Sequence, residues 1–222
     1  MRLSTLGIRN VTRSRFRTVM TVLGVAVAII AFVMLRTILS AWTQAADFAA
    51  KDRVVTRHKV SFIMSLPGKY LTEVEQIPGV NQAAAASWFG AKDPNHQNEF
   101  FSSFAVDPES YLAVYDEMLV PDAQKTEWFG NRTGALVGDS LAKKFGWKVG
   151  DKVTLKGTIY PGDWEFRIDG IYTATRRSVD RTSFLFHYDY LNEWLRKMRP
   201  QAADSRGWIT TRIDRSQGAA EM

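Results

Sequence analysis

The longest unbroken apolar pattern in the chain lies near its N-terminus. Val19–Leu35 is a run of 17 residues in which Thr21 is the one polar side chain. A few residues added at each end bring it to about 20, enough to cross a hydrocarbon core of roughly 30 Å. Residues 18–42 are therefore predicted to be a transmembrane helix with its outward extension.

The segment before this run is basic and amphipathic. Residues 1–17 contain no acidic residue and five arginines: Arg2, Arg9, Arg13, Arg15 and Arg17. Leu3, Leu6 and Val11 recur at the spacing of one helix face, which predicts an arm in the interface with membrane lipid. A disordered basic flank is the alternative. Because basic flanks stay in the cytoplasm, the chain beyond Trp42, an interfacial tryptophan, is predicted to lie outside.

A cleaved signal peptide would show the same order of a basic and an apolar segment. Apolar regions of signal peptides run to about 7–15 residues, and this one is longer, which favours an anchor. The apolar 3–4 spacing then continues through Ala45, Phe48 and Ala49. Residues 40–52 are therefore predicted to continue the helix outward as a lever between the membrane and the remaining chain.

Beyond the lever, short strand-like and helix-like patterns are interspersed, which is typical of an α+β fold. Strands are predicted at 54–65, 80–89, 100–106, 134–137, 152–159, 165–172, 182–186 and 208–213. Helices are predicted at 67–77, 108–115, 140–145 and 189–198. Residues 216–222 resemble the first turn of a further helix, so the chain is expected to be part of a longer protein.

Composition narrows the classes of function. The formal charge is +6, but without the five arginines of the arm 24 basic residues face 23 acidic ones, a balance of +1. The predicted outer part is thus nearly neutral and carries no basic stripe, which argues against nucleic-acid binding. The absence of cysteine excludes disulfides and thiolate metal sites.

No pattern in the chain predicts catalysis, a cofactor or a metal. Gly138–Leu141 spells GDSL, a hydrolase signature, but the one Asp-x-x-His tetrad, Asp93–His96, precedes it instead of following it near the C-terminus. The simpler interpretation is that Asp139 or Ser140 caps the helix predicted at 140–145. The three histidines lack metal-ligand spacing, and no P-loop for ATP is present.

Several segments, taken in order, resemble the permease subunits of the MacB/FtsX/LolCE-type ABC transporters. Residues 3–30 are similar to the family's first segment, A-L-R-N-L-x-R-x-x-x-R-T-x-L-T-x-L-G-I-x-x-G, with departures at Gly7 and Ala28. Ile77–Val80 matches I-P-G-V, and 134–155 resembles V-G-x-x-L-A-x-x-L-G-x-x-x-G-D-x-V-x-L. Residues 166–172 are similar to the F-x-V-x-G-I-y strand that follows.

The resemblance implies a periplasmic core domain at 43–222, anchored in the bacterial inner membrane and built of two lobes. These are a porter-like lobe from both chain ends and an inserted mixed lobe at roughly 104–177. It also implies that ATP hydrolysis belongs to a separate cytoplasmic subunit, because Met1 directly precedes the arm. A second permease copy or a paralogue would complete a dimer, and a periplasmic partner or lipoprotein would be the cargo.

Two other classes of function stay open at this point. A single-pass, membrane-anchored sensor or scaffold would show the same helix and domain, and an anchored esterase would use Ser140.

In the mechanism that the resemblance implies, cytoplasmic ATPases move the first helices and the outer domains follow as rigid bodies.

Overall fold

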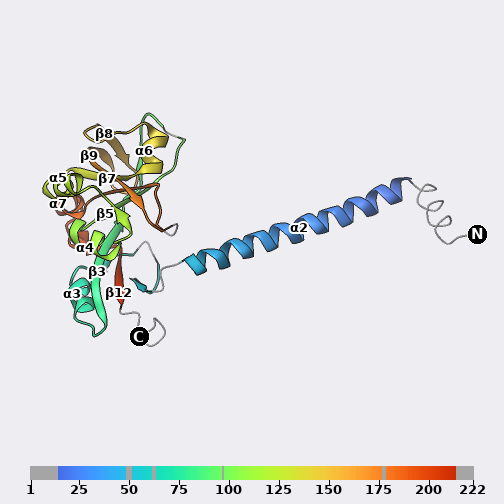
Figure 1. Cartoon of the computed structure of the whole chain (residues 1–222), viewed down its shortest axis with the longest axis horizontal. Helices are drawn as coiled ribbons and strands as arrows, with labels where there is room; N and C mark the ends of the chain where they lie inside the picture. Colours follow the sequence, from blue (N-terminus) through green and yellow to red (C-terminus); the bar gives the residue numbers. More distant parts are fainter. Residues whose placement is uncertain (1–14, 49–51, 62–63, 97, 177–178, 214–222) are drawn as a thin grey trace, which may run out of the picture. The chain divides into compact units, whose positions relative to one another are not determined.

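The computed structural model describes residues 15–48, 52–61, 64–96, 98–176 and 179–213, with side chains described up to Ser40 in the first helix. The chain divides into two compact units, 1–49 and 50–222. The described part of the first unit is one long helix, and the second unit is a mixed sheet with short helices (Figure 1). The α+β class and the single N-terminal apolar helix expected from the sequence are confirmed.

Helix α2, Arg15–Phe48, contains 34 residues, about 51 Å at 1.5 Å per residue. Its Arg15–Ser40 part is long and apolar enough to span a membrane, and none of that apolar surface is buried within the structure. The helix therefore includes the whole segment predicted to cross the membrane. Residues 1–14 of the expected arm, and Ala49 at the end of the expected lever, lie outside the described residues.

The main sheet of the second unit has the strand order β1-β12-β3-β5-β10-β7-β9-β8-β4, with β6 paired to β9. The pairs β5–β10 and β7–β9 are parallel and the others are antiparallel. The strands are β1 (Arg53–Arg57), β3 (Val80–Trp88), β4 (Ala91–Lys92), β5 (Ser102–Val106), β6 (Met118–Leu119), β7 (Gly134–Gly138), β8 (Lys152–Gly157), β9 (Gly162–Ala174), β10 (Ser183–His187) and β12 (Trp208–Ile213). A separate small sheet joins β2 (Leu66–Pro67) to β11 (Ser205–Arg206).

Helices cover both faces of the central strands, which explains why every residue of β7 and β10 is buried. Phe184 and Phe186 of β10 belong to the larger core cluster, and Leu185 between them belongs to the cluster on the opposite face. The helices are α3 (Lys69–Glu75), α4 (Pro108–Val114), α5 (Asp122–Gly130), α6 (Asp139–Phe145) and α7 (Tyr188–Met198), followed by a 3-10 turn at Pro200–Ala202. Helices α6 and α7 pack on the first face, and α4 and α5 on the second.

Helix α6 ends where the sequence predicted. Gly146 follows Phe145 with φ +72°, a left-handed conformation that favours glycine, and its N–H caps the carbonyl of Ala142. The strands predicted at 152–159 and 165–172 are also present, as the antiparallel pair β8 and β9.

Two sequence predictions need correction. The strand predicted at 54–65 ends at Arg57, because β1 pairs with β12 over five residues only, and the exposed Val60 and Met64 after it bury no apolar face. The helix predicted from Pro67 starts at Lys69, since Pro67 belongs to β2. Helix α5 was not predicted at all.

The expected division into two lobes stays a prediction. Residue 104, the expected start of the insert, lies inside β5, and β10, from beyond the insert, pairs with both β5 and β7. The two expected lobes thus share one sheet. Residues 216–222, predicted to begin another helix, lie outside the described residues.

Candidate functional site

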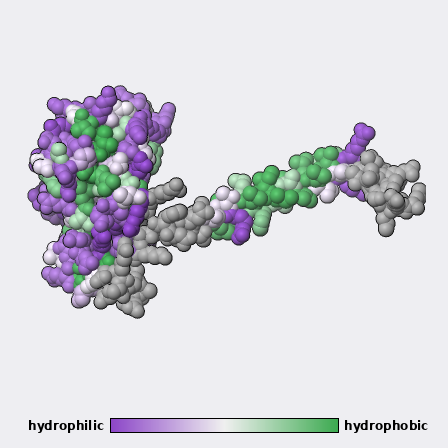
Figure 2. All heavy atoms as spheres, viewed as in Figure 1, coloured by the Kyte–Doolittle hydropathy of each residue, from purple (hydrophilic) through white to green (hydrophobic). Residues whose placement is uncertain are grey.

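Two threonines in the apolar part of α2 satisfy their hydroxyl groups within the helix. The hydroxyls of Thr21 and Thr37 donate hydrogen bonds of 2.9 Å and 2.8 Å to the carbonyls of Arg17 and Val33, four residues earlier. Such bonds inside the helix are what a hydrocarbon environment requires. Figure 2 shows a continuous hydrophobic surface along this part of the helix.

Of the residues predicted to set topology, Arg15 and Arg17 are exposed in the first turn of α2. Arg9 and Arg13 lie outside the described residues. Helix α2 continues for eight residues beyond Ser40, through Trp42 and Ala45 to Phe48, so the predicted outward extension is helical up to that point.

The first and last described strands of the second unit, β1 and β12, lie side by side. Arg53 at the start of β1 pairs with Arg212 near the end of β12. The N–H of Ile213 donates a 2.9 Å hydrogen bond to the carbonyl of Asp52, and the Thr211 hydroxyl donates one of 3.2 Å to the carbonyl of Val54. The strand that starts the domain is therefore fixed to the last described strand.

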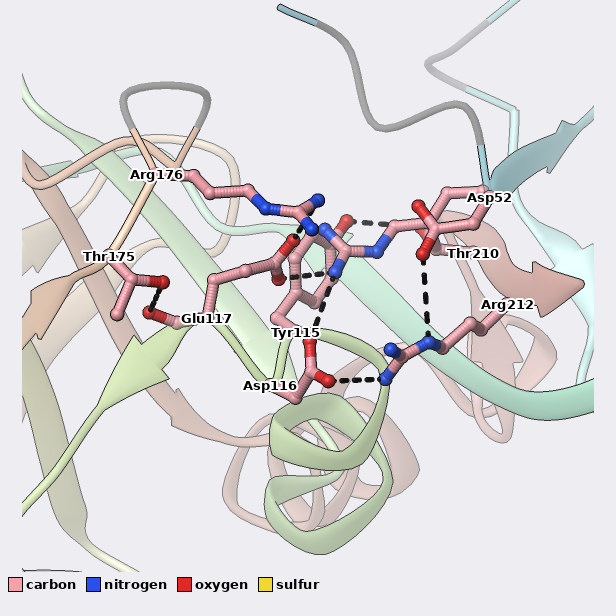
Figure 3. A network of polar contacts seen from close by, with 9 residues as sticks. Asp52, Tyr115, Asp116, Glu117, Thr175, Arg176, Thr210 and Arg212 are labelled. Atoms are coloured by element: carbon pink, nitrogen blue, oxygen red, sulfur yellow. Dashed lines mark hydrogen bonds and ion pairs between the residues drawn. The ribbon is translucent and has the colours of Figure 1, made fainter. Parts of the chain in front are cut away.

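A network of ion pairs surrounds this junction (Figure 3). We call it the root clamp: Asp52, Arg53, Asp116, Glu117, Arg176 and Arg212. The Arg53 guanidinium donates to the Glu117 carboxylate and lies 3.7 Å from that of Asp116. These residues come from β1 and the residue before it, from the turn after α4, from the segment after β9 and from β12. The clamp thus joins parts of the chain that are far apart in sequence.

Glu117 is the centre of the root clamp. Its side chain is 6% exposed and that of Arg53 is 8% exposed, so both charges are shielded from water. Arg176 donates a second bond to Glu117, at 3.2 Å. The backbone carbonyl of Glu117 accepts a 3.0 Å hydrogen bond from the N–H of Thr175. One residue therefore holds both the start of the domain and the end of β9.

Asp116 forms the outer half of the clamp. Arg212 donates a 2.7 Å hydrogen bond to it and lies 3.8 Å from the Asp52 carboxylate. Burial works toward a higher pKa for Asp116, but the hydrogen bond and charge of Arg212, with the charge of Arg53, outweigh it and lower the pKa. The same bond raises the pKa of Arg212.

Tyr115 fills the space beneath these ion pairs. The guanidinium of Arg53 lies 4.6 Å from the centre of its ring, within the range of a cation–π contact. The Tyr115 hydroxyl donates a 3.3 Å hydrogen bond to Oγ1 of Thr210 on β12. Its ring also lies 4.5 Å from that of Tyr111 on α4.

A second ion pair joins α4 to the segment before β12, at the opposite end of both elements. Asp107, which precedes α4, accepts a 3.4 Å hydrogen bond from Arg206 of β11. Burial raises the pKa of Asp107 in spite of the nearby Arg206, and the charge of Asp189 acts in the same direction. Its second oxygen, Oδ2, is buried with no hydrogen-bond partner. The carboxylate after α4, Asp116, is thus stabilised in its charged form, whereas the carboxylate before α4, Asp107, is not.

Removing the charge of Asp116 and removing the charge of Asp107 are expected to have opposite effects on the stability of the domain. The folded pKa of Asp116 lies below its unfolded value, so its stabilisation is present above the unfolded pKa and is lost as pH falls through the folded one. Asp107 has a raised pKa, so its charged form opposes folding once pH rises through that pKa. At pH 7, Asp116→Asn is expected to lower the thermal midpoint, and Asp107→Asn to leave it unchanged or raise it. Thermal melts of both variants at pH 7 and pH 4 test this, and a larger loss from Asp107→Asn would contradict it.

The GDSL segment has a structural explanation. Arg181 donates from Nε and from a terminal nitrogen to the two oxygens of Asp139, which holds the pKa of that carboxyl below its usual value, with burial opposing. A Cβ on Gly138 would collide with the backbone carbonyl of Arg181, so the position needs glycine. In the described part of the chain, no histidine forms a hydrogen bond with Ser140. Residues 138–141 therefore lie at the start of α6, but the predicted cap is wrong: Asp139 is the first residue of the helix, and the N-cap is Gly138, which has no side chain.

His96 and His187 each have a hydrogen-bond partner that is not Ser140. His96 contacts Asp93 at 2.7 Å, and its ring lies 4.6 Å from that of Phe145, at the far end of α6 from Ser140. Nε2 of His187 lies 2.7 Å from the carbonyl oxygen of Trp128, and burial lowers the pKa of that imidazole. Among the described residues, no group of three His, Asp or Glu side chains is arranged to hold a metal ion.

Sequence patterns did not identify the root clamp. Its hydrogen-bonded pairs are separated by 59 to 96 residues in the sequence, so no local spacing connects them. The one local signal is Arg212, a charged residue between Thr211 and Ile213 in an otherwise uncharged strand.

Comparison with known proteins gives one family. Residues 18–217 match the profile of the MacB-like periplasmic core domain. The fold is similar to that of the periplasmic region of MacB from Actinobacillus actinomycetemcomitans, with 13% identity, a TM-score of 0.52 and coverage of 78% of this chain and 80% of that one. It is also similar to a domain of a Porphyromonas gingivalis protein described as a permease, with 17% identity, a TM-score of 0.51 and coverage of 74% and 76%. No curated protein sequence matches significantly. Because the family profile spans most of the chain, the protein belongs to the MacB-like periplasmic core domain family.

Proposed function

We propose that this chain is the membrane-anchored part of an ABC transporter permease that transmits ATP-driven motion to its extracytoplasmic domain. The observation that carries the proposal is the way in which the start of the domain, at β1, is held by the root clamp. Helix α2 continues past its apolar part to Phe48, and β1, which starts five residues later at Arg53, is fixed to the domain by buried charges. Only four residues separate the helix from the strand, which is too short for a long linker.

The buried charges of the root clamp favour a rigid attachment of β1 to the rest of the domain. Breaking a buried ion pair by removing one partner costs about 3–5 kcal/mol, so Arg53 and Glu117 resist separation. Glu117 also contacts Arg176, which follows β9. Force applied to β1 would therefore reach β9 through Glu117, in addition to reaching β12 through strand pairing. A displacement of α2 would then move the domain as one body, as in hinge or shear motions of rigid domains.

The remaining parts of the transporter follow from family membership and are proposed here. A cytoplasmic ATP-binding subunit would supply the energy, and a second permease copy or a paralogue would complete a dimer. The basic arm would lie at the cytoplasmic face of the inner membrane and the second unit in the periplasm. Lipoprotein, efflux substrates or a cell-envelope partner would be the cargo.

Reporter fusions test this arrangement, because motion must pass from one side of the membrane to the other. A reporter that is active only in the cytoplasm is expected to work when fused at Met1 and to be silent when fused after Asp52. Both fusion proteins are measured by immunoblot, so that a silent reporter is not simply absent. Activity of the Asp52 fusion, or release of a soluble domain by signal peptidase, would contradict the proposal.

A further inference from the structure

A hollow of about 220 Å³ lies between α7 and the start of β9. Three aromatic and four charged side chains line it, from α7, from β9 and from the segment before β7. Ligand pockets for drug-sized molecules begin at roughly 300 Å³, so this hollow suits a single ring. It is separate from the root clamp, with which it shares no residue.

One face of α7 forms a wall of the hollow. Tyr190 precedes Glu193 and Trp194 by three and four residues, and Lys197 follows them by four and three, which places all of them on one side of the helix. Leu191 and Leu195 on the other side are buried in the core, so the position of this face is fixed.

Three aromatic rings give the hollow its shape. The ring of Trp164 lies 5.1 Å from that of Tyr190 at 76°, and 5.9 Å from that of Trp194 at 43°. Trp164 is 3% exposed, whereas Tyr190 and Trp194 are half-buried and keep accessible surface. The indole N–H of Trp164 donates to the carbonyl of Tyr160, which holds its ring in place.

The charged groups around the rings balance one another. Glu193 lies 2.6 Å from Arg132 and 2.9 Å from Lys197, so both cations already have an anionic partner. Asp163 has no side-chain partner among the described residues. With two cations and two carboxylates, the lining has no net charge, which favours neither a strongly anionic nor a strongly cationic ligand.

We propose that this hollow binds one pyranose ring of a neutral saccharide. The apolar C–H face of such a ring would stack on Tyr190 and Trp194, whose faces are large and rigid. Its hydroxyls both donate and accept, so they would bond to the Asp163 and Glu193 carboxylates and to the N–H groups of Arg132 and Lys197. A neutral ligand with an apolar face and a polar rim matches both parts of the lining.

Binding of chitotriose and maltotriose to the full chain in detergent tests the proposal, by tryptophan fluorescence and saturation-transfer NMR. At least one trisaccharide is expected to bind saturably. Trp194→Ala should weaken it by roughly tenfold or more, and Trp194→Phe should restore most of it. Trp88→Ala is the matched control, since Trp88 is also a half-buried tryptophan in contact with other rings but does not line the hollow.

Two further measurements, on a second variant and on a lipid-linked saccharide, make each outcome decisive. Glu193→Gln removes the charge that orders the rim and should also weaken binding, which covers the case in which Trp194→Ala does not fold. Nanodiscs with a neutral glycolipid distinguish a lipid-linked saccharide from a soluble one. Absence of saturable binding in every arm, equal binding by Trp194→Ala, or preference for trilysine would overturn the proposal. None of these outcomes depends on whether the chain acts in transport.

Discussion

Inserting a flexible Gly-Ser segment after Ala46 is expected to abolish the function of the assembled transporter while ATP hydrolysis continues. The insertion interrupts α2 between its apolar part, which ends at Ser40, and the root of the domain. A Gly-Ser linker behaves as a random coil, so it transmits neither direction nor torque. Movements of the transmembrane helices would then no longer reach the periplasmic unit.

The control is the same insertion at Asn98, in an exposed loop of the domain, where added length is tolerated. It should leave function largely intact, as should Ser140→Ala and His96→Ala. Function is measured as cargo movement in cells, and ATP hydrolysis in the purified complex. A silent insertion after Ala46 combined with a loss of activity in Ser140→Ala would restore the esterase interpretation.

Arg53→Ala is expected to be the most destabilising single change in the root clamp. It leaves the buried Glu117 with Arg176 as its remaining cation, so the cost should be near the lower end of the range for broken buried ion pairs, about 3 kcal/mol. For a domain of this size that corresponds to a fall in the thermal midpoint of about 6–12 °C. Tryptophan fluorescence of the full chain in detergent measures it.

Arg196→Ala is the matched control, because Arg196 forms a 2.8 Å ion pair with Asp204 whose side chains are 64% and 65% exposed. Exposed pairs contribute about 0–1 kcal/mol, so this variant should melt close to the wild type. In a double-mutant cycle, Arg53→Ala with Glu117→Ala should cost less than the sum of the two single changes. Additive costs, or equal effects of Arg53→Ala and Arg196→Ala, would show that the clamp does not hold the root.

The parts of the fold that were predictable from sequence have strong local patterns. The apolar run of α2 and the end of α6 at Gly146 depend on residues that are neighbours in the chain. Helix α5 was missed because Trp128 is its one buried residue, so it has almost no apolar periodicity. Strand β1 was predicted too long because its end depends on the length of its partner, β12, at the other end of the domain sequence.

The candidate site was less predictable for the same reason. Arg53, Glu117 and Arg212 come together only through the pairing of β1 with β12 and the position of the turn after α4. The sequence did indicate the lever that leads to them, and its helical part extends to Phe48. Whether Ala45 and Phe48 act as parts of a lever stays a prediction.

A distance measurement tests most directly whether α2 and the domain move as one body. The chain has no cysteine, so Ile38→Cys in α2 and Ile159→Cys in the domain, at positions 49% and 43% exposed, can carry two spin labels. Doubly labelled chains are diluted with unlabelled ones, so that pulsed electron resonance reports distances within one chain. In complexes assembled with the ATP-binding subunit, the account predicts a narrow distribution that is the same with and without ATP, and a broad one after the Gly-Ser insertion. A broad distribution in the uninterrupted chain, or one that shifts with ATP, would contradict it.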